Sequence, residues 1–136
     1  MLRDSLTKLD DITSWDCDEI NYIFLHGNLN RPSDRFDKNN SNPKSTSFIR
    51  GAFKDLSKRS GVDTIVEKTC ANSLRIPFLR SLHPNAYYIC IFRDGYDVIQ
   101  SAVKKSTSAV NFNYLFKKAK YIPCLLYTSP SPRDRI

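Results

Sequence analysis

Residues 87–101 read Tyr-Tyr-Ile-Cys-Ile-Phe-Arg-Asp-Gly-Tyr-Asp-Val-Ile-Gln-Ser, and this stretch decides the expected fold. Its first six residues form a nearly continuous apolar run, which is typical of a strand buried on both faces of a parallel sheet. Asp94 is suited to cap a following helix that carries Val98 and Ile99. The stretch therefore predicts a buried strand over 87–92 that leads directly into a helix.

A second strand is expected upstream of this stretch. Residues 63–67 read Asp-Thr-Ile-Val-Glu and are rich in the β-branched residues that strands favour. Between the two strands, Asn72 can cap a helix with an apolar side made of Leu74, Phe78, Leu79 and Leu82. The order strand, helix, strand, helix suits a right-handed crossover and a parallel sheet. The fold class predicted from these residues is α/β.

The first half of the chain predicts helices separated by a long polar loop. Apolar spacing favours a short helix that stops at Gly27. Residues 28–45 have no periodicity, and loops of this length inside compact domains often bind ligands. A clear amphipathic helix follows, capped by one of the hydroxyl residues at 45–47 and ended by Gly61.

The charge of the chain is unevenly distributed. Its 136 residues contain 21 Lys and Arg against 14 Asp and Glu, a net charge of +7. Residues 1–20 are acidic, whereas residues 21–123 are strongly basic. A basic body favours polyanions such as nucleotides, nucleic acid, phosphorylated substrates or a membrane surface, and the alternative is a solubilising surface charge. Because the aromatic residues sit mostly at core-patterned positions, we expect no nucleic-acid partner.

The cysteine and histidine pattern does not predict a metal site. The four cysteines contain no Cys-x-x-Cys pair, and neither His26 nor His83 lies near one of them. Cys90, inside the apolar run, is expected to be a small core residue. The sequence also has no apolar run long enough to span a bilayer and no signal-peptide pattern at its start, so localisation and any membrane anchor stay unassigned.

Arg93 and Ser101 form a candidate phosphate site. In open α/β sheets, ligands bind beyond the carboxyl ends of the strands, and Arg93 is expected at such an end. Its guanidinium offers a fixed set of donors to a phosphate, and the N-terminus of the next helix adds backbone N–H groups. Ser101 lies two turns along that helix and can add a hydroxyl. The alternative is that Arg93 is an ion-paired strand-end residue and Ser101 an ordinary helix residue.

Three stretches of the sequence together resemble a known family. They are residues 66–75 (Val-Glu-Lys-Thr-Cys-Ala-Asn-Ser-Leu-Arg), residues 82–86 (Leu-His-Pro-Asn-Ala) and residues 91–101 (Ile-Phe-Arg-Asp-Gly-Tyr-Asp-Val-Ile-Gln-Ser). They resemble the sulfotransferases that use 3′-phosphoadenosine 5′-phosphosulfate (PAPS), most closely the branch with protein-tyrosine and carbohydrate sulfotransferases. The resemblance implies a P-loop-like three-layer sandwich with a parallel sheet, and a transferase that moves a sulfuryl group from PAPS to a hydroxyl of a protein tyrosine or a carbohydrate.

The resemblance also implies roles for individual residues. It places Arg93 and Ser101 on the 3′-phosphate of PAPS, and Lys68 at the sulfuryl group in transfer, although Cys70 stands where much of the family has proline. It makes Glu19 the candidate general base, with Asp18 next. The alternatives are that Lys68 is a surface lysine at a strand end and that the two acids only favour the first turn of a helix.

The resemblance further implies a partial domain, truncated at both ends. The first strand and the Gly-rich loop that cradle the 5′-phosphosulfate are missing, so Met1 is expected to be internal to a longer reading frame and the chain inactive as given. Residues 124–134 resemble one translated frame of a transposon-type sequencing adapter. We therefore expect residues 1–123 to be part of a sulfotransferase domain and residues 124–136 not to be native. The alternative function is a non-catalytic module that binds nucleotides or polyanions.

Overall fold

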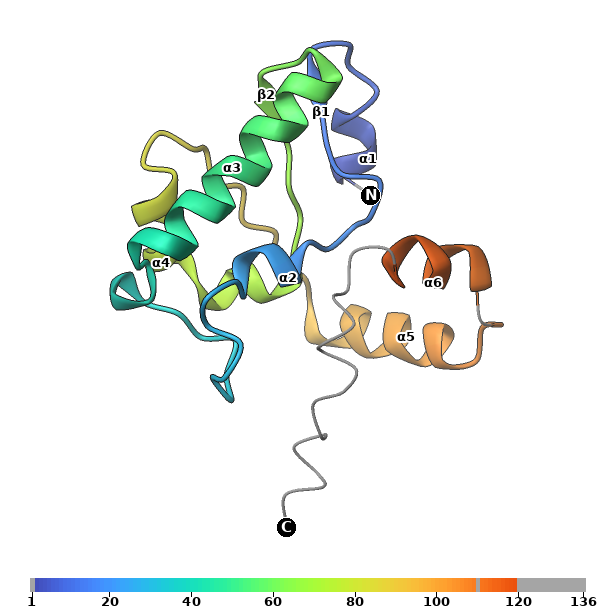
Figure 1. Ribbon diagram of the computed structural model, residues 1–136. Coiled ribbons are helices and arrows are strands. Elements are labelled where there is room, and N and C mark those ends of the chain that lie inside the picture. Colours follow the sequence, from blue (N-terminus) through green and yellow to red (C-terminus); the bar gives the residue numbers. More distant parts are fainter. Residues whose placement is uncertain (1, 110, 120–136) are drawn as a thin grey trace.

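The computed structural model describes residues 2–109 and 111–119, so the expected adapter segment lies outside the described residues (Figure 1). Its helices and strands, in chain order, are α1 (Leu2–Leu6), β1 (Ile12–Thr13), α2 (Asn21–Phe24), the 3-10 helix η1 (Lys38–Asn40), α3 (Pro43–Ser60), β2 (Thr64–Ile65), the 3-10 helix η2 (Cys70–Leu74), α4 (Ile76–Leu82), α5 (Gly95–Ser106) and α6 (Phe112–Ala119).

The described residues contain a small parallel sheet of two strands. Ile12 lies opposite Thr64 and Thr13 opposite Ile65, and the N–H of Val66 donates to the carbonyl oxygen of Thr13 at 2.9 Å. The mixed helix and strand content agrees with the α/β class. The strand at 12–13 was not predicted, because two residues are too short to show a period.

Helix α3 is the longest element and begins earlier than its apolar pattern predicted. Asn42 is its N-cap and accepts a hydrogen bond from the N–H of Ser45, while Pro43 occupies the first turn, where its missing N–H removes no intrahelical bond. Gly61 ends the helix with a φ of 70°, a left-handed conformation that favours glycine. The expected start at 45–47 was therefore wrong by one turn, whereas the expected end at Gly61 is confirmed.

The hydrophobic core lies between α2, α3 and α4. Its fully buried side chains include Phe24 from α2, Ile49 from α3 and Phe78 and Leu82 from α4. Partly buried Phe53 packs against this cluster and meets the ring of Trp15 edge-on, with 4.8 Å between the ring centroids. The three helices and the strands thus share one core, which fixes the position of the chain that leaves β2.

The polar loop after α2 is anchored by a buried arginine. Arg75, which is 0% exposed, donates from Nε to the carbonyl oxygen of Asp34 at 2.8 Å and from Nη2 to its Oδ1 at 2.5 Å. Its guanidinium also lies over the ring of Phe36, 4.6 Å from the centroid. Phe36 is itself buried, so this part of the loop is a packed segment of the core.

The expected buried strand at 87–92 is not formed in the described structure. Tyr87 is 99% exposed and Phe92 is 90% exposed, and Cys90 is exposed instead of lying in the core. A strand that is apolar on both faces becomes buried only when other chains pair with its edges and cover its faces. The described residues supply neither for this run, so the expected three-layer sandwich is reduced to a two-stranded sheet with helices.

Helices α5 and α6 follow this run and stand apart from α3 and α4 (Figure 1). Asp94 caps α5 as predicted, because its Oδ1 accepts from the N–H of Tyr96 at 2.8 Å. Among the described residues of α5 and α6 whose side chains are placed, none is buried. The hydroxyl of Tyr114 donates to Asp18 Oδ1 at 2.5 Å and ties α6 to the chain before α2. Within the described part of the chain, no helix is long and apolar enough to cross a membrane.

Candidate functional site

Lys68 and Glu19 meet at the end of the sheet, although they are 49 positions apart in the sequence. Lys68 Nζ lies 3.8 Å from Glu19 Oε1, and the two side chains are 37% and 27% exposed. Lys68 is carried by the extended chain that continues β2, and Glu19 by the segment that leads into α2. Both candidate catalytic groups are therefore close together and accessible to solvent.

A hydrogen-bonded clamp holds these two segments together. The hydroxyl of Thr69, a buried residue, donates to Glu67 Oε1 and accepts from the N–H of Ile20 at 3.1 Å. Asn72 Nδ2 donates to Glu67 Oε2 at 2.7 Å. Because the clamp joins the neighbour of Lys68 to the neighbour of Glu19, it limits how far the ion pair can separate. The resemblance did not assign roles to Glu67, Thr69 or Asn72. Asn72 was expected to cap a helix, and this was wrong, because it lies inside η2 and α4 begins at Ile76 with Arg75 at its N-cap.

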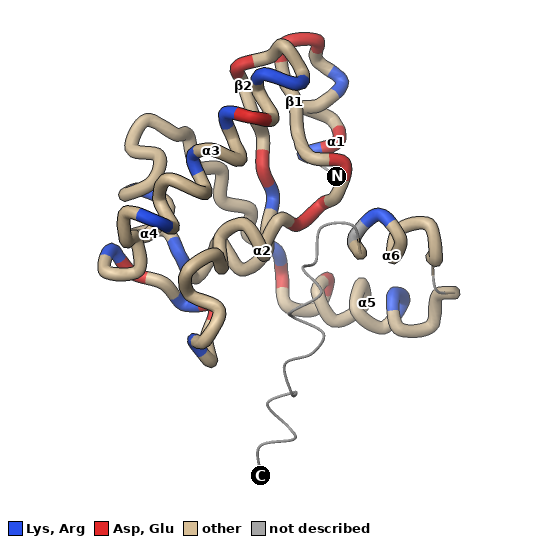
Figure 2. Tube along the Cα trace, in the orientation of Figure 1, with Lys and Arg blue, Asp and Glu red and all other residues tan. Residues whose placement is uncertain are grey.

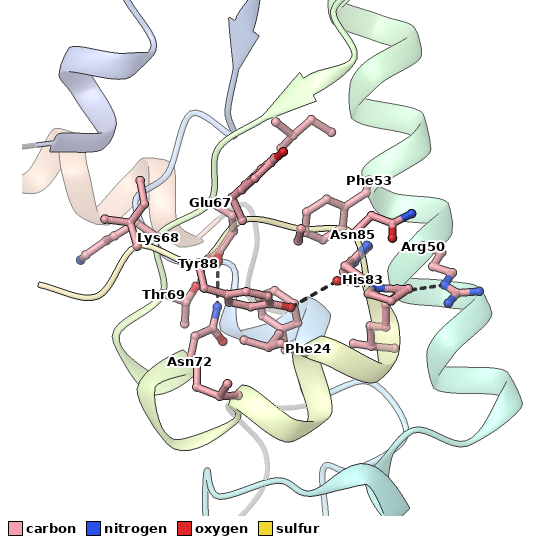
Figure 3. Close-up of a pocket in the computed structure, with 18 of the residues that line it drawn as sticks. Phe24, Arg50, Phe53, Glu67, Lys68, Thr69, Asn72, His83, Asn85 and Tyr88 are labelled. Carbon is pink, nitrogen blue, oxygen red and sulfur yellow. Dashed lines mark hydrogen bonds between the residues drawn. The ribbon is translucent and has the colours of Figure 1, made fainter.

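The environment of Glu67 favours its neutral form. Burial raises the pKa of Glu67 to about 6, even though the bonds from Thr69 and Asn72 and the charges of Lys68 and Arg75 favour the ionised form. Glu67 and Lys68 point to opposite sides of the chain, as expected for successive residues in an extended segment. Figure 3 shows Glu67 turned toward Asn72 and Lys68 directed away from the other labelled side chains.

Arg93, just before α5, reaches Ser101 in the second turn of that helix. Arg93 Nη2 lies 3.2 Å from Ser101 Oγ, which places the guanidinium and the hydroxyl within reach of one anion. Both side chains are exposed. Asp94, which follows Arg93, is the N-cap of α5, and its carboxylate accepts a hydrogen bond from the N–H of Tyr96. The cluster is thus a set of accessible donors at the N-terminus of a 12-residue helix, where the helix dipole also favours an anion.

A cavity of about 930 Å³ lies beside the Lys68 segment. Its apolar floor includes Phe24, Phe53 and Leu79, and its two sides are the chain of 65–70 and the chain of 86–91. Two buried wall atoms, Asn72 Oδ1 and His83 Nε2, have no hydrogen-bond partner among the described residues. Sequence reasoning missed this cavity, because it exists only where the expected strand at 87–92 stands unpaired.

Basic residues are spread over several elements instead of one stripe. Figure 2 shows Lys and Arg on α3, α4, α5 and α6. Lys68 and Arg93 each have a side-chain partner at short range, and Arg75 is paired with Asp34 inside the core. In the described residues, no cluster of three His, Cys, Asp or Glu side chains could hold a metal ion.

A small parallel sheet, a lysine–glutamate pair at a strand end and an arginine–serine pair at a helix N-terminus define an α/β protein with donors for an anionic substrate. A model of the sulfotransferase family matches residues 9–122, which is most of the chain. The chain therefore belongs to the sulfotransferase family. Searches of curated proteins and of solved structures gave no significant match. Family membership implies PAPS as the sulfuryl donor and a hydroxyl-bearing acceptor.

Titration of Glu67 predicts a pH dependence of stability. Its pKa is raised to about 6 in the folded state from 4.5, so folding favours the protonated form. This contribution is complete below pH 4.5 and is lost as the pH rises through 6, by about 2 kcal/mol of unfolding free energy. We therefore expect the natural chain to lose about 2 kcal/mol of unfolding free energy relative to Glu67→Gln between pH 4 and pH 7. Urea titrations at the two pH values measure this loss.

The difference between the two chains is the informative quantity, because His83 titrates with the opposite sign. Burial, followed by the charge of Arg50, lowers the pKa of His83, so its contribution is lost as the pH falls below 6.5. This effect is common to the natural chain and to Glu67→Gln and cancels in the difference. A difference that stays constant across the pH range would show that folding does not shift the pKa of Glu67.

Proposed function

We propose that this chain is part of a sulfotransferase domain in which Arg93 and Ser101 bind the 3′-phosphate of PAPS, Lys68 lies at the transferred sulfuryl group and Glu19 is the general base for the acceptor hydroxyl. The observation that carries the proposal is the 3.2 Å approach of Arg93 Nη2, just before α5, to Ser101 Oγ in the second turn of that helix. Two donors from residues eight positions apart converge there, on a chain that belongs to the sulfotransferase family.

The 3′-phosphate site uses both charge and geometry. A guanidinium and a hydroxyl can each donate to a different phosphate oxygen, and charge-assisted bonds of this kind are the stronger ones in proteins. The helix N-terminus adds its partial positive charge. The site is exposed in the described structure, so water screens these interactions and each contributes modestly.

The lysine–glutamate pair supports an in-line transfer. The acceptor oxygen attacks sulfur while the bond from sulfur to the bridging phosphate oxygen breaks. The acceptor proton moves to the carboxylate of Glu19, and the ammonium of Lys68 stabilises the negative charge that develops on the leaving oxygen. The two groups form an ion pair with 3.8 Å between Lys68 Nζ and Glu19 Oε1, which brings a base and a cation to the same place.

The chain is proposed to be an incomplete domain, with residues 1–123 native and residues 124–136 translated from adapter. The exposed apolar run at 87–92 supports this, because uncovered strands of that composition are an aggregation hazard in a finished fold. The chain has four glycines and no Gly-rich stretch that could cradle the 5′-phosphosulfate. A place in the branch that sulfates protein tyrosine or carbohydrate is proposed from the motifs at 66–75 and 91–101.

The test separates binding from turnover. We expect the 136-residue chain to bind adenosine 3′,5′-bisphosphate but to produce none from PAPS in the presence of tyrosine peptides or oligosaccharides. Binding is followed by chemical-shift changes in Arg93 and Ser101, and turnover by chromatography of the nucleotide products. Absence of binding would contradict the 3′-phosphate site, and turnover would contradict the incomplete domain. Binding without turnover in a longer chain that contains a Gly-rich loop would favour a non-catalytic nucleotide-binding module.

A further inference from the structure

The peptide unit between Glu19 and Ile20 is held at both of its polar groups. The thiol of Cys17 donates to the carbonyl oxygen of Glu19 at 3.0 Å, and the N–H of Ile20 donates to Thr69 Oγ1 at 3.1 Å. In a trans peptide the C=O and N–H groups point in opposite directions, so the two contacts lie on opposite sides of the unit. A unit held on one side can pivot about that contact, whereas a unit held on both sides keeps its orientation.

The segment that carries this unit depends on side-chain contacts for its path. Residues 14–20 lie between β1 and α2, so neither element fixes their backbone. Cys17 and Ile20 are 4% and 1% exposed, which shows that the segment is packed against the core. Arg3 Nη1 donates to the carbonyl oxygen of Cys17 at 2.7 Å and holds that residue in turn. The orientation of Glu19 therefore depends on these contacts and not on a helix or a strand.

Buried surroundings set the direction of both hydrogen bonds. The single hydrogen of the Thr69 hydroxyl is donated to Glu67 Oε1, so a lone pair is left to accept the N–H of Ile20. Asn72 Nδ2 holds the other oxygen of Glu67 at 2.7 Å. Burial raises the pKa of the Cys17 thiol, so the thiol keeps the hydrogen that it donates. The Thr69 hydroxyl is the stronger partner, because a thiol is a weak donor.

Two neighbouring acids face different partners beside this unit. Glu19 Oε1 lies 3.8 Å from Lys68 Nζ. Asp18 Oδ1, from the preceding residue, accepts from the hydroxyl of Tyr114 at 2.5 Å. The sequence allowed either acid to serve as the base. The orientation of the backbone at this point therefore decides which carboxylate faces the lysine.

We propose that Thr69 and Cys17 are positioning residues for the carboxylate of Glu19. By holding the peptide unit that follows Glu19, they place this carboxylate, and not that of Asp18, at the ammonium of Lys68. Both residues act through Glu19 and not on the reacting atoms. The role of Glu19 as a base rests on the proposed function, whereas the placement of its carboxylate does not. Thr69 has the larger effect, because its hydroxyl also belongs to the segment that carries Lys68.

A cross-link without a spacer measures which acid faces Lys68. A carbodiimide activates a carboxyl group, and an amine in contact with it then forms an amide while the carbodiimide leaves as a urea. On the full 136-residue chain, fragmentation in a mass spectrometer gives the ratio of the amide between Lys68 and Glu19 to the amide between Lys68 and Asp18. In the natural chain the amide to Glu19 should predominate. Thr69→Val keeps the shape but not the hydroxyl and should lower the ratio by about fivefold, the factor expected for one hydrogen bond.

Further variants separate positioning from stability. Thr69→Ser restores a hydroxyl and should recover the natural ratio, and Cys17→Ala should lower the ratio by less than Thr69→Val does. Thr64→Val makes the same change at an exposed position of β2 and should leave the ratio intact. Ile49→Val shortens a fully buried side chain of α3 and should lower stability without changing the ratio. An unchanged ratio in Thr69→Val or Cys17→Ala, no recovery in Thr69→Ser, or a loss in either control equal to that in Thr69→Val would overturn the proposal.

This result does not depend on the proposed function, because neither PAPS nor an acceptor is present. A chain that shows the expected ratios but does not bind adenosine 3′,5′-bisphosphate would support the positioning role and contradict the proposed function. A chain that binds this nucleotide but keeps its ratio in Thr69→Val would contradict the positioning role alone.

Discussion

Replacing Arg93 by alanine is expected to weaken the binding of adenosine 3′,5′-bisphosphate by about tenfold, or about 1.4 kcal/mol of binding free energy. Arg93 Nη2 and Ser101 Oγ lie 3.2 Å apart and present donors to one anion. A hydrogen bond to a charged group contributes about 1.5–3 kcal/mol, and exposure of this site lowers the expected effect to the bottom of that range. Affinities are measured by calorimetry or by chemical-shift titration.

A second ligand makes this measurement specific to the 3′-phosphate. Adenosine 5′-phosphate shares every group except that phosphate, so Arg93→Ala should leave its affinity unchanged and remove the difference between the two ligands. Arg31→Ala, which alters another exposed arginine, should keep the difference. If Arg93→Ala weakened both ligands equally, Arg93 would contribute through general charge and not through the 3′-phosphate.

Truncation of Arg75 is expected to produce the largest loss of stability. Arg75→Ala should lower the free energy of unfolding by about 3 kcal/mol. The side chain is fully buried, and its two bonds to Asp34 and its contact with Phe36 hold the loop against α4. Burial lowers the pKa of Arg75, and the charge of Asp34 opposes this change, so the cation depends on its partner. Urea unfolding followed by the fluorescence of Trp15, a buried residue, measures the loss.

Two further variants separate the roles of volume and charge at this position. Arg75→Met keeps most of the side-chain volume without the charge and should destabilise less than Arg75→Ala, because apolar replacements of buried ions are often tolerated. Asp34→Asn should have a smaller effect, since the Asp34 side chain is 45% exposed and its backbone carbonyl still accepts from Arg75. An Arg75→Ala midpoint equal to that of Arg31→Ala would show that the loop does not depend on this anchor.

Some features of the fold could be predicted because they depend on neighbours in the sequence. The end of α3 at Gly61 and the cap of α5 by Asp94 follow from the left-handed conformation of glycine and from a carboxylate two residues before a free N–H. The start of α3 also depends on neighbouring residues, the N-cap Asn42 and Pro43 in the first turn. The apolar pattern of the helix begins one turn later, and for that reason it predicted a later start. These features need no tertiary contact, so they can be predicted from a single sequence.

The candidate site was predictable in part. Lys68 and Arg93 were identified from motifs beside expected strands, but nothing local indicates that Lys68 faces Glu19 or that Thr69 bonds the N–H of Ile20. Those contacts depend on the pairing of β1 with β2, which brings the start of the chain to the end of the sheet. The burial of Glu67 that raises its pKa arises from the same packing.

The run from Tyr87 to Phe92 shows which properties of a segment depend on its sequence and which depend on the tertiary structure around it. Its composition alone determined that this segment favours extended chain and avoids water, because β-branched and aromatic side chains fit a pleated, covered surface. Whether it becomes a strand depends on chains that pair with its backbone and cover its faces, and the described tertiary structure leaves it extended and exposed beside a cavity. Backbone hydrogen bonds in a sheet are made between distant segments, so propensity can favour a strand but only a neighbouring chain can complete it.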